Sequence, residues 1–349
     1  MTIEIAGRSI GADHSPFVIA EMSGNHNQSL ERALSIVQAA AQAGAHAIKL
    51  QTYTADTMTL NVRGGSFEIN DPDSLWAGQN LHDLYKKAYT PWEWHGPIME
   101  RARELGLICF SSPFDETAVD FLEDLGAPAY KIASFENNHL PLIEKAASTG
   151  KPLIISTGMA TLSELDDAVK TAREAGCQQL ILLKCTSNYP ASPENTNLRT
   201  IPHLCQLFNT EVGLSDHTMG IGAAVAAIAL GASVVEKHFT LARADGGVDS
   251  AFSLEPAELA SLVSETERAW QALGEVRYGP TEAEQKSLVF RRSIYVAEDI
   301  AEGELFTTKN IRIVRPGNGV PPSLYRELLG RSARRNFSCG EPLCLNQLL

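Results

Sequence analysis

The sequence has no run of basic residues, no apolar stretch as long as a membrane span and no CxxC pair. Its 349 residues include 29 Lys and Arg against 42 Asp and Glu, a formal net charge of −13. Nucleic acid and anionic membranes are poor partners for such a chain, and we expect neither. An anionic ligand would have to be held by individually placed lysines, so any lysine at a predicted site is informative.

The N-terminal stretch "MTIEIAGRSIGADHS" carries an early acid and no apolar signal region, which predicts a cytoplasmic protein. Four of the six cysteines lie inside apolar runs. Together these features predict buried thiols in a reducing compartment rather than zinc ligands or disulfides. The six are Cys109, Cys177, Cys185, Cys205, Cys339 and Cys344.

Eight short apolar runs alternate with stretches of helical periodicity, most of which end at glycine. This order predicts a (β/α)8 TIM barrel in the α/β class, with a doubly wound open sheet as the alternative. The runs span 17–22, 46–53, 107–114, 129–134, 152–158, 179–186, 211–218 and 233–240. One connection, from 54 to about 91, is long enough to predict a functional segment next to the site.

The pattern changes after the helical stretch that ends near 275. We therefore predict a catalytic barrel over 1–275, a polar linker over 276–290 and a small β-rich domain over 291–349. The last segment contains a weak internal repeat, "EDIAEGELF" at 298–306 and "RNFSCGEPL" at 335–343. The repeat suggests two similar halves.

Polar residues gather where the predicted strands end, and a barrel brings these ends together on one face. Lysines and hydroxyls around one mouth suit a phosphate and a carboxylate, and two histidines at neighbouring strand ends suit a divalent cation. A single strand-end His or Lys is often structural or solvated, but many on the same face favour a site. Only every second residue can point inward. The set is Glu21, Lys49, Gln51, Ser111, Ser112, Lys131, Ser134, Ser156, Thr157, Lys184, Thr186, Ser187, Ser215, Asp216, His217, Glu236, Lys237 and His238.

Nine motifs, in order, resemble the sialic acid synthase (NeuB-like) family, which joins a TIM barrel to an antifreeze-like SAF domain of β-clip fold. They are "IAEMSGNHN", "AIKLQTYT", "FSSPFD", "YKIASFE", "STGMAT", "KCTSNYP", "GLSDHT", "VEKHFT" and "VRPGNG". The stretches "LYKKAYTPWEWH" and "SAFSLEP" are most similar to the pseudaminic acid synthase branch of that family.

The resemblance implies condensation of phosphoenolpyruvate with 2,4-diacetamido-2,4,6-trideoxy-L-altrose. It implies that Glu21 acts on the attacking water, and that His217 and His238 hold a divalent metal, Mn²⁺ or similar. The residues implied for binding phosphoenolpyruvate are Lys49, Lys131, Ser112, Ser134, Ser156 and Ser215. Those implied for the sugar are Tyr189, Asp249 and Arg315. Ser187 departs from the family pattern, in which Asn is common, so a sugar contact from that position is in doubt.

The resemblance also implies a domain-swapped homodimer, in which Arg315 reaches the partner's barrel. A loose alignment places Trp76 of the long segment where sialic acid synthases have Asn, which predicts an apolar wall for a sugar methyl group. Three alternatives remain: a sialic or legionaminic acid synthase, a Schiff-base aldolase, and a barrel that serves only as a scaffold for a binding domain.

Overall fold

A computed structural model of the chain describes residues 3–72 and 74–348. It divides into two compact units, Met1–Gly274 and Glu275–Leu349. Among the described residues, no helix has both the length and the apolar character needed to cross a membrane.

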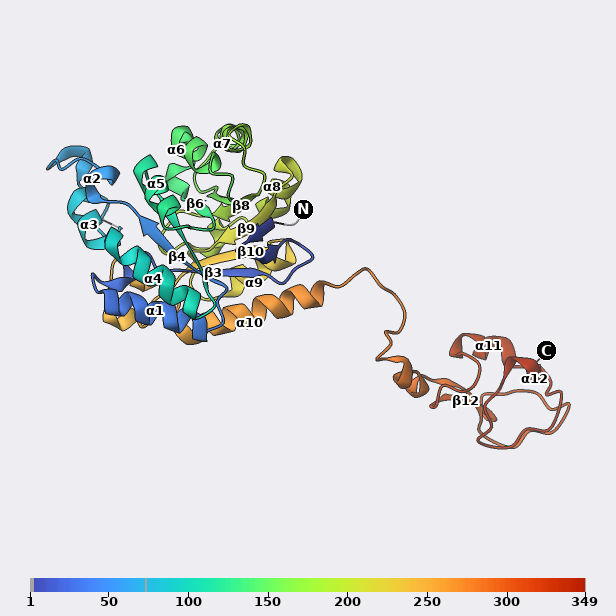
Figure 1. Cartoon of the computed structure of the whole chain (residues 1–349). Helices are drawn as coiled ribbons and strands as arrows, with labels where there is room; N and C mark the ends of the chain where they lie inside the picture. The colour runs from blue at the N-terminus through green and yellow to red at the C-terminus, as the bar shows by residue number, and fades with distance from the viewer. Residues whose placement is uncertain (1–2, 73, 349) are drawn as a thin grey trace. The chain divides into compact units, whose positions relative to one another are not determined.

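Eight parallel strands of the first unit form a closed barrel (Figure 1). β10 pairs with β3 from Val234↔Phe17 to His238↔Glu21, which closes the sheet. The predicted TIM barrel is therefore confirmed, and the open-sheet alternative is wrong. The strands are β3 Phe17–Glu21, β4 Ala47–Thr52, β5 Ile108–Pro113, β6 Tyr130–Ile132, β7 Leu153–Ser156, β8 Leu180–Cys185, β9 Glu211–Ser215 and β10 Val234–His238.

Helices alternate with these strands along the chain, and α7 shows why they form. Thr161 and Glu164 make a capping box at its start, with each side chain accepting the other's backbone N–H. Its buried residues recur at helical spacing, and the chain leaves the helix at Gly176, whose φ is +106°. The helices of this unit are α1 Leu30–Gln42, α2 Ala55–Met58, α3 Leu81–Ala88, α4 Trp92–Glu104, α5 Glu116–Asp124, α6 Leu140–Ala147, α7 Leu162–Glu174, α8 Thr200–Phe208, α9 Gly222–Ala229 and α10 Pro256–Leu273.

A hairpin of β1 (Ile3–Ile5) and β2 (Arg8–Ile10) fills one end of the barrel. Ile3, Ile5 and Ile10 share a buried cluster with Phe17 and Val234, which begin their strands. The amino end of the barrel is thus packed with apolar side chains, which leaves its carboxyl end for a site.

All eight strands end one to three residues before the predicted runs do, and two of these early ends change where site residues lie. β6 stops at Ile132 because Ser134–Glu136 forms a 3-10 turn, and β9 stops at Ser215, so His217 lies in the loop that follows. The long segment after β4 is not structureless, because it contains α2 and α3. His82 Nε2 lies 2.8 Å from Asp56 Oδ1 and ties these two helices together.

The cysteines of the barrel differ in exposure. Cys109, Cys177 and Cys185 are buried thiols, as expected, whereas Cys205 on α8 is exposed, contrary to the expectation. The apolar run that contains Cys205 is an amphipathic helix, and this residue lies on its outer face.

The second unit is a small β-rich fold with its own buried cluster, which includes Ile294, Phe306 and Phe337. The two halves of the sequence repeat pair with each other, because Ile300 and Phe337 exchange backbone hydrogen bonds of 2.9 Å in both directions. Its elements are β11 Ser293–Val296, β12 Ile311–Val314, α11 Tyr325–Leu328 and α12 Leu345–Leu348, with β11 and β12 antiparallel.

Candidate active site

The polar residues at the strand ends separate into an inner and an outer set. On β3, Phe17 and Ile19 pack with the hairpin inside the barrel, whereas Val18 and Ala20 pack with the helices outside. Glu21 continues the inner series because successive strand residues face opposite sides. The same alternation places these further residues inside: Lys49, Gln51, Ser112, Lys131, Ser156, Cys185, Ser215, Glu236 and His238. Ser111, Lys184 and Lys237 face outward, so their prediction as site residues is wrong.

Two lysines and two carboxylates form a buried ionic cluster inside the barrel. Lys49 Nζ lies 2.6 Å from Glu21 Oε2 and 3.4 Å from Glu236 Oε2. Lys131 Nζ lies 3.5 Å from Glu236 Oε1. Ser215 donates to Glu236 Oε1 at 3.0 Å. Glu236 therefore bridges the two lysines that the sequence assigns to an anion.

The two carboxyl groups of the cluster differ in their acidity. Burial raises the pKa of Glu21 to about 7, although Lys49 opposes the shift. Burial acts in the same direction on Glu236, but Lys131 and Lys49 outweigh it and lower its pKa to about 2. Burial also lowers the pKa of Lys131. With Glu21 partly protonated near neutral pH, its carboxyl group offsets less of the lysine charge, which favours an anionic ligand despite the acidic chain.

Serine hydroxyls surround the backbone at Gly158, just after β7. The Gly158 N–H donates to Ser134 Oγ at 3.1 Å. A Cβ added at position 158 would lie 2.3 Å from Ser187 Oγ and 2.6 Å from Ser134 Oγ. Only glycine at this position therefore lets both hydroxyls come so close to the backbone. Ser156 Oγ is buried with no hydrogen-bond partner among the described residues. Such an unsatisfied hydroxyl suits a bound phosphate oxygen.

The imidazoles of His217 and His238 lie together, with ring centroids 5.3 Å apart. His217 Nδ1 donates to the Thr186 carbonyl at 2.9 Å, which leaves Nε2 with its lone pair. His238 Nδ1 is buried without a hydrogen-bond partner among the described residues. Burial holds the pKa of His238 well below its ordinary value and favours the neutral ring that can bind a metal.

A cavity of about 430 Å³ opens beside His238. Asp249 and Tyr189 contribute polar groups to its lining, and Trp76, Met58 and Leu81 from the long segment contribute apolar ones. The Tyr189 ring packs against His217, with centroids 4.4 Å apart. The predicted sugar residues of the barrel are thus next to the predicted metal ligands.

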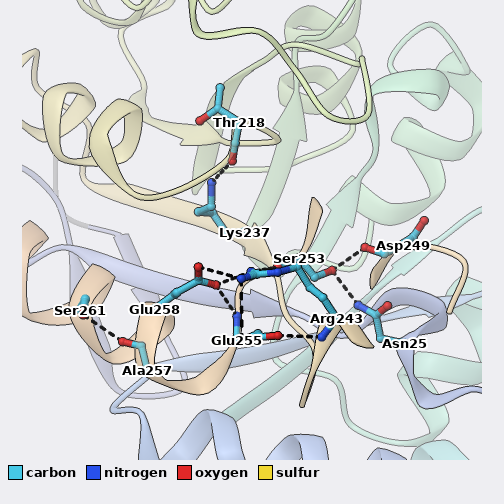
Figure 2. Close-up of polar contacts among 10 residues, drawn as sticks. All are labelled: Asn25, Thr218, Lys237, Arg243, Asp249, Ser253, Glu255, Ala257, Glu258 and Ser261. Carbon is cyan, nitrogen blue, oxygen red and sulfur yellow. Dashed lines mark hydrogen bonds and ion pairs between the residues drawn. The ribbon is translucent and has the colours of Figure 1, made fainter. Parts of the chain in front are cut away.

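The position of Asp249 is fixed by contacts between distant parts of the chain. Asn25 Nδ2 donates to Ser253 Oγ at 2.9 Å, and Ser253 Oγ donates to the Asp249 carbonyl at 2.7 Å (Figure 2). The Ser23 hydroxyl donates to the Asp249 carboxylate. Trp76 Nε1 donates to the neighbouring Val248 carbonyl at 3.0 Å. The loop after β10 is therefore held by Ser23 and Asn25 from the turn after β3 and by Trp76 from the long segment after β4.

Comparison with known sequences identifies the family. A sequence model of the NeuB family matches residues 36–278, and one of the SAF domain matches residues 291–349. The chain belongs to the NeuB family. It is 44% identical to the pseudaminic acid synthase of Campylobacter jejuni subsp. jejuni serotype O:2, over 96% of this chain and 97% of that protein. It is 43% identical to the pseudaminic acid synthase of Helicobacter pylori, over 95% and 98%.

A solved structure of a sialic acid synthetase has a similar fold. The N-acetylneuraminic acid (sialic acid) synthetase of Leptospira borgpetersenii, crystallised with citrate, superposes with a TM-score of 0.73 at 33% identity. The match covers 82% of this chain and 95% of that one. The predicted fold of a TIM barrel followed by an SAF domain is confirmed.

Two acidic residues of this NeuB-family site received no role from the sequence. Glu236 bridges Lys49 and Lys131, and its position two residues before His238 marked it as inward-facing. Glu136 lines the cavity, and burial raises its pKa to about 7. Its signal in the sequence was weak, because it lies in a turn beyond β6.

Two further predicted residues have different outcomes. Ser187, whose contact with the sugar was in doubt, lines the cavity and also reaches the hydroxyl cluster at Gly158. Arg315 directly follows β12 in the second unit and is exposed, with no side-chain hydrogen bond or ion pair to the described residues. Its role at a sugar stays a prediction.

Proposed function

We propose that the chain is a pseudaminic acid synthase, which condenses phosphoenolpyruvate with 2,4-diacetamido-2,4,6-trideoxy-L-altrose to give pseudaminic acid and phosphate. The observation that carries this proposal is the identity of 43–44% to two pseudaminic acid synthases over nearly the whole chain. Identity to the sialic acid synthetase structure is lower, at 33%. The inward ionic cluster and the cavity at His238 support the proposal, because they would supply an anion site and a sugar site.

Phosphoenolpyruvate would bind with its anionic groups against Lys49 and Lys131. Ser112 supports this arrangement, because it accepts a hydrogen bond from Lys49 Nζ at 3.2 Å. The hydroxyls of Ser134 and Ser156 would complete the binding of carboxylate and phosphate oxygens, and Ser215 would join them on turning its proton away from Glu236. Partial protonation of Glu21 would leave more of the lysine charge for the ligand.

The sugar would occupy the cavity lined by Tyr189 and Asp249, with its aldehyde toward the two histidines. His217 and His238 fit a divalent metal, because one offers Nε2 and the other has a buried ring nitrogen without a hydrogen-bond partner among the described residues, 3.9 Å from Asp249 Oδ2. The described residues contain no cluster of three His, Cys, Asp or Glu side chains suited to a metal, so water and substrate oxygens would complete the shell. A bound Mn²⁺ or similar ion would supply Lewis acidity to the aldehyde oxygen.

In the proposed reaction, C3 of phosphoenolpyruvate forms a bond to the aldehyde carbon, and C2 becomes cationic. The aldehyde oxygen receives the C=O electrons and a proton and becomes a hydroxyl, water adds to C2 and loses one proton, and the C2–O bond to phosphate then breaks as the new C2 hydroxyl loses its proton to leave a ketone. Glu21 is the group proposed to take the proton of that water, because its pKa of about 7 suits a base that works near neutral pH. Lys49, which contacts Glu21, would hold the carboxylate close to the phosphoenolpyruvate.

The active assembly is proposed to be a domain-swapped homodimer, in which Arg315 of one subunit reaches the acetamido group of a sugar in its partner's barrel. The exposure of Arg315 and its lack of a side-chain partner among the described residues support this role. A guanidinium with five donors suits an acetamido carbonyl.

The test is phosphate release from phosphoenolpyruvate with a small panel of amino sugars. We expect release with the 6-deoxy-L-altrose derivative and much less with N-acetylmannosamine or the legionaminic acid precursor. Preference for either of the latter would reassign the substrate within the family. Borohydride trapping of a lysine adduct with a keto acid would instead indicate a Schiff-base aldolase.

A further inference from the structure

Each of the two histidines is directly preceded by one partner of a buried ion pair. Asp216 precedes His217, and Lys237 precedes His238. Lys237 Nζ lies 2.8 Å from Asp216 Oδ2, and the two side chains are 1% and 0% exposed. Lys237 faces outward from β10, so the pair lies behind the site and not in it.

Lys237 also reaches the residue on the other side of His217. Its Nζ donates to the Thr218 carbonyl at 2.7 Å, a contact drawn in Figure 2. The opposite oxygen of the Asp216 carboxylate, Oδ1, accepts the Thr218 N–H at 2.9 Å. The backbone on both sides of His217 is therefore held by one lysine and its partner.

This position needs such support because β9 ends at Ser215. From Asp216 onward isolated backbone contacts replace the strand ladder: the Asp216 N–H donates to the Glu236 carbonyl and the Ala191 N–H donates to the His217 carbonyl, each at 2.9 Å. His217 is thus carried on a loop, whereas His238 is the last residue of β10. Lys237 belongs to the same strand as His238 and connects the two segments.

Stability alone is a poor explanation for this pair. Removing two charges from water has a large cost, and replacing a buried pair with apolar residues is often neutral or stabilising. The specific effect of the Asp216–Lys237 pair is to hold the 216–218 segment against β10. The distance between the two imidazoles depends on where the 216–218 segment lies relative to β10. Lys237 makes two side-chain contacts that hold the segment against this strand, beside the single backbone hydrogen bond from Asp216 to Glu236.

We propose that Lys237 is a positioning residue, which holds the 216–218 segment against β10 and so sets the spacing of His217 and His238 for a shared ligand. The metal part of this inference rests on the proposed function. The positioning part concerns the backbone and can be measured without any metal.

The test variant is the double substitution Asp216→Asn with Lys237→Met, which removes both charges together and leaves no unpaired buried ion. The side-chain amide oxygen introduced at position 216 can still accept the Thr218 N–H, so the substitution removes only the two interactions that Lys237 makes. The control is Glu123→Gln with Lys151→Met, which makes the same change of charge at a partly exposed ion pair by the amino end of β7.

Two measurements are made on the full-length protein. Hydrogen exchange of the metal-free protein should be about tenfold faster in the peptide that covers 216–222 of the test variant, and unchanged there in the control. Mn²⁺ titration should show affinity weakened by about 10- to 100-fold in the test variant only, as for residues that orient metal ligands.

Unchanged exchange at 216–222, or faster exchange spread evenly over the barrel, would overturn the positioning role. If wild-type protein binds no Mn²⁺, the proposed metal site fails, while the exchange result still decides whether Lys237 positions the segment. Normal Mn²⁺ binding by the test variant would show that Lys237 does not set the ligand spacing.

Discussion

Lys49 Nζ lies 2.6 Å from Glu21 Oε2, and the two residues face each other across β3 and β4. Both side chains are buried. Burial raises the pKa of Glu21 while Lys49 counteracts it, and the balance is near 7. This contact places a carboxylate that can accept a proton beside a lysine that can bind an anion.

Glu21→Gln should lower kcat for phosphate release by about 10²- to 10⁴-fold, the usual contribution of a general base. Gln has the same shape but cannot accept the proton. Removing a negative charge beside Lys49 should leave phosphoenolpyruvate binding unchanged or tighter, and equilibrium binding measures this separately. An unchanged kcat would remove Glu21 from the mechanism.

The pH dependence of kcat/KM should also report the protonation of Glu21. Below pH 7 Glu21 takes up a proton and is lost as a base, so kcat/KM should decrease toward about tenfold per pH unit on the acid side. The profile of Glu21→Gln should be flatter across this limb. If the limb persists in this variant at its original position, it belongs to another group.

Lys131→Met should lower kcat/KM for phosphoenolpyruvate by about 10- to 100-fold, the effect of losing a hydrogen bond to a charged group. Lys184→Met is the matched control, because Lys184 also ends a barrel strand but faces outward and donates to the Cys185 carbonyl. Its kinetics should stay within about threefold of wild type, since no ligand contact is removed. Equal losses in both variants would contradict the inner and outer division.

The sequence was sufficient for the barrel and for most of the ionic cluster, because both follow from local periodicity. Once the strands are placed, alternation alone separates Lys49 and Lys131 from Lys184. The contact of Trp76 with Val248 could not be predicted, since it joins loops separated by 172 residues. The hydroxyl cluster at Gly158 was equally hidden, because it depends on how closely three loops approach.

The histidines give a test of the metal. Excess chelator should abolish turnover, and Mn²⁺ should restore it, because an ion held by only two protein ligands, the two proposed imidazoles, would stay accessible to the chelator. His217→Ala and His238→Ala should each lose Mn²⁺ binding in a titration. His203→Ala, which removes an exposed ring on α8, should bind as wild type does. Full activity in chelator would contradict the metal site.

Trp76 should contribute to the choice of a 6-deoxy sugar. Its indole lines the cavity, with its ring centroid 6.0 Å from that of Tyr189. Trp76→Asn should reduce the preference for a methyl over a hydroxymethyl group, which in an apolar pocket is about 100-fold at best. Trp76→Phe keeps an apolar wall without the Val248 hydrogen bond and should retain most of the preference. Relative kcat/KM values for the two sugars measure this, and an unchanged ratio in Trp76→Asn would limit Trp76 to holding the loop.

Arg315 gives the test of the domain-swapped dimer. Arg315→Ala and Lys131→Ala chains should each keep about a tenth of wild-type activity or less as homodimers, one lacking the arm residue and the other a barrel residue. When the two chains are unfolded together and refolded in equal amounts, random pairing makes about half of the dimers mixed. Each mixed dimer has one site with an intact barrel and an intact arm, so about a quarter of all sites should recover activity if the arm acts in trans. Native mass spectrometry measures the mixed fraction, and the phosphate assay measures the recovery. Mixed dimers without recovered activity would show that Arg315 acts within its own chain or has no role at the sugar.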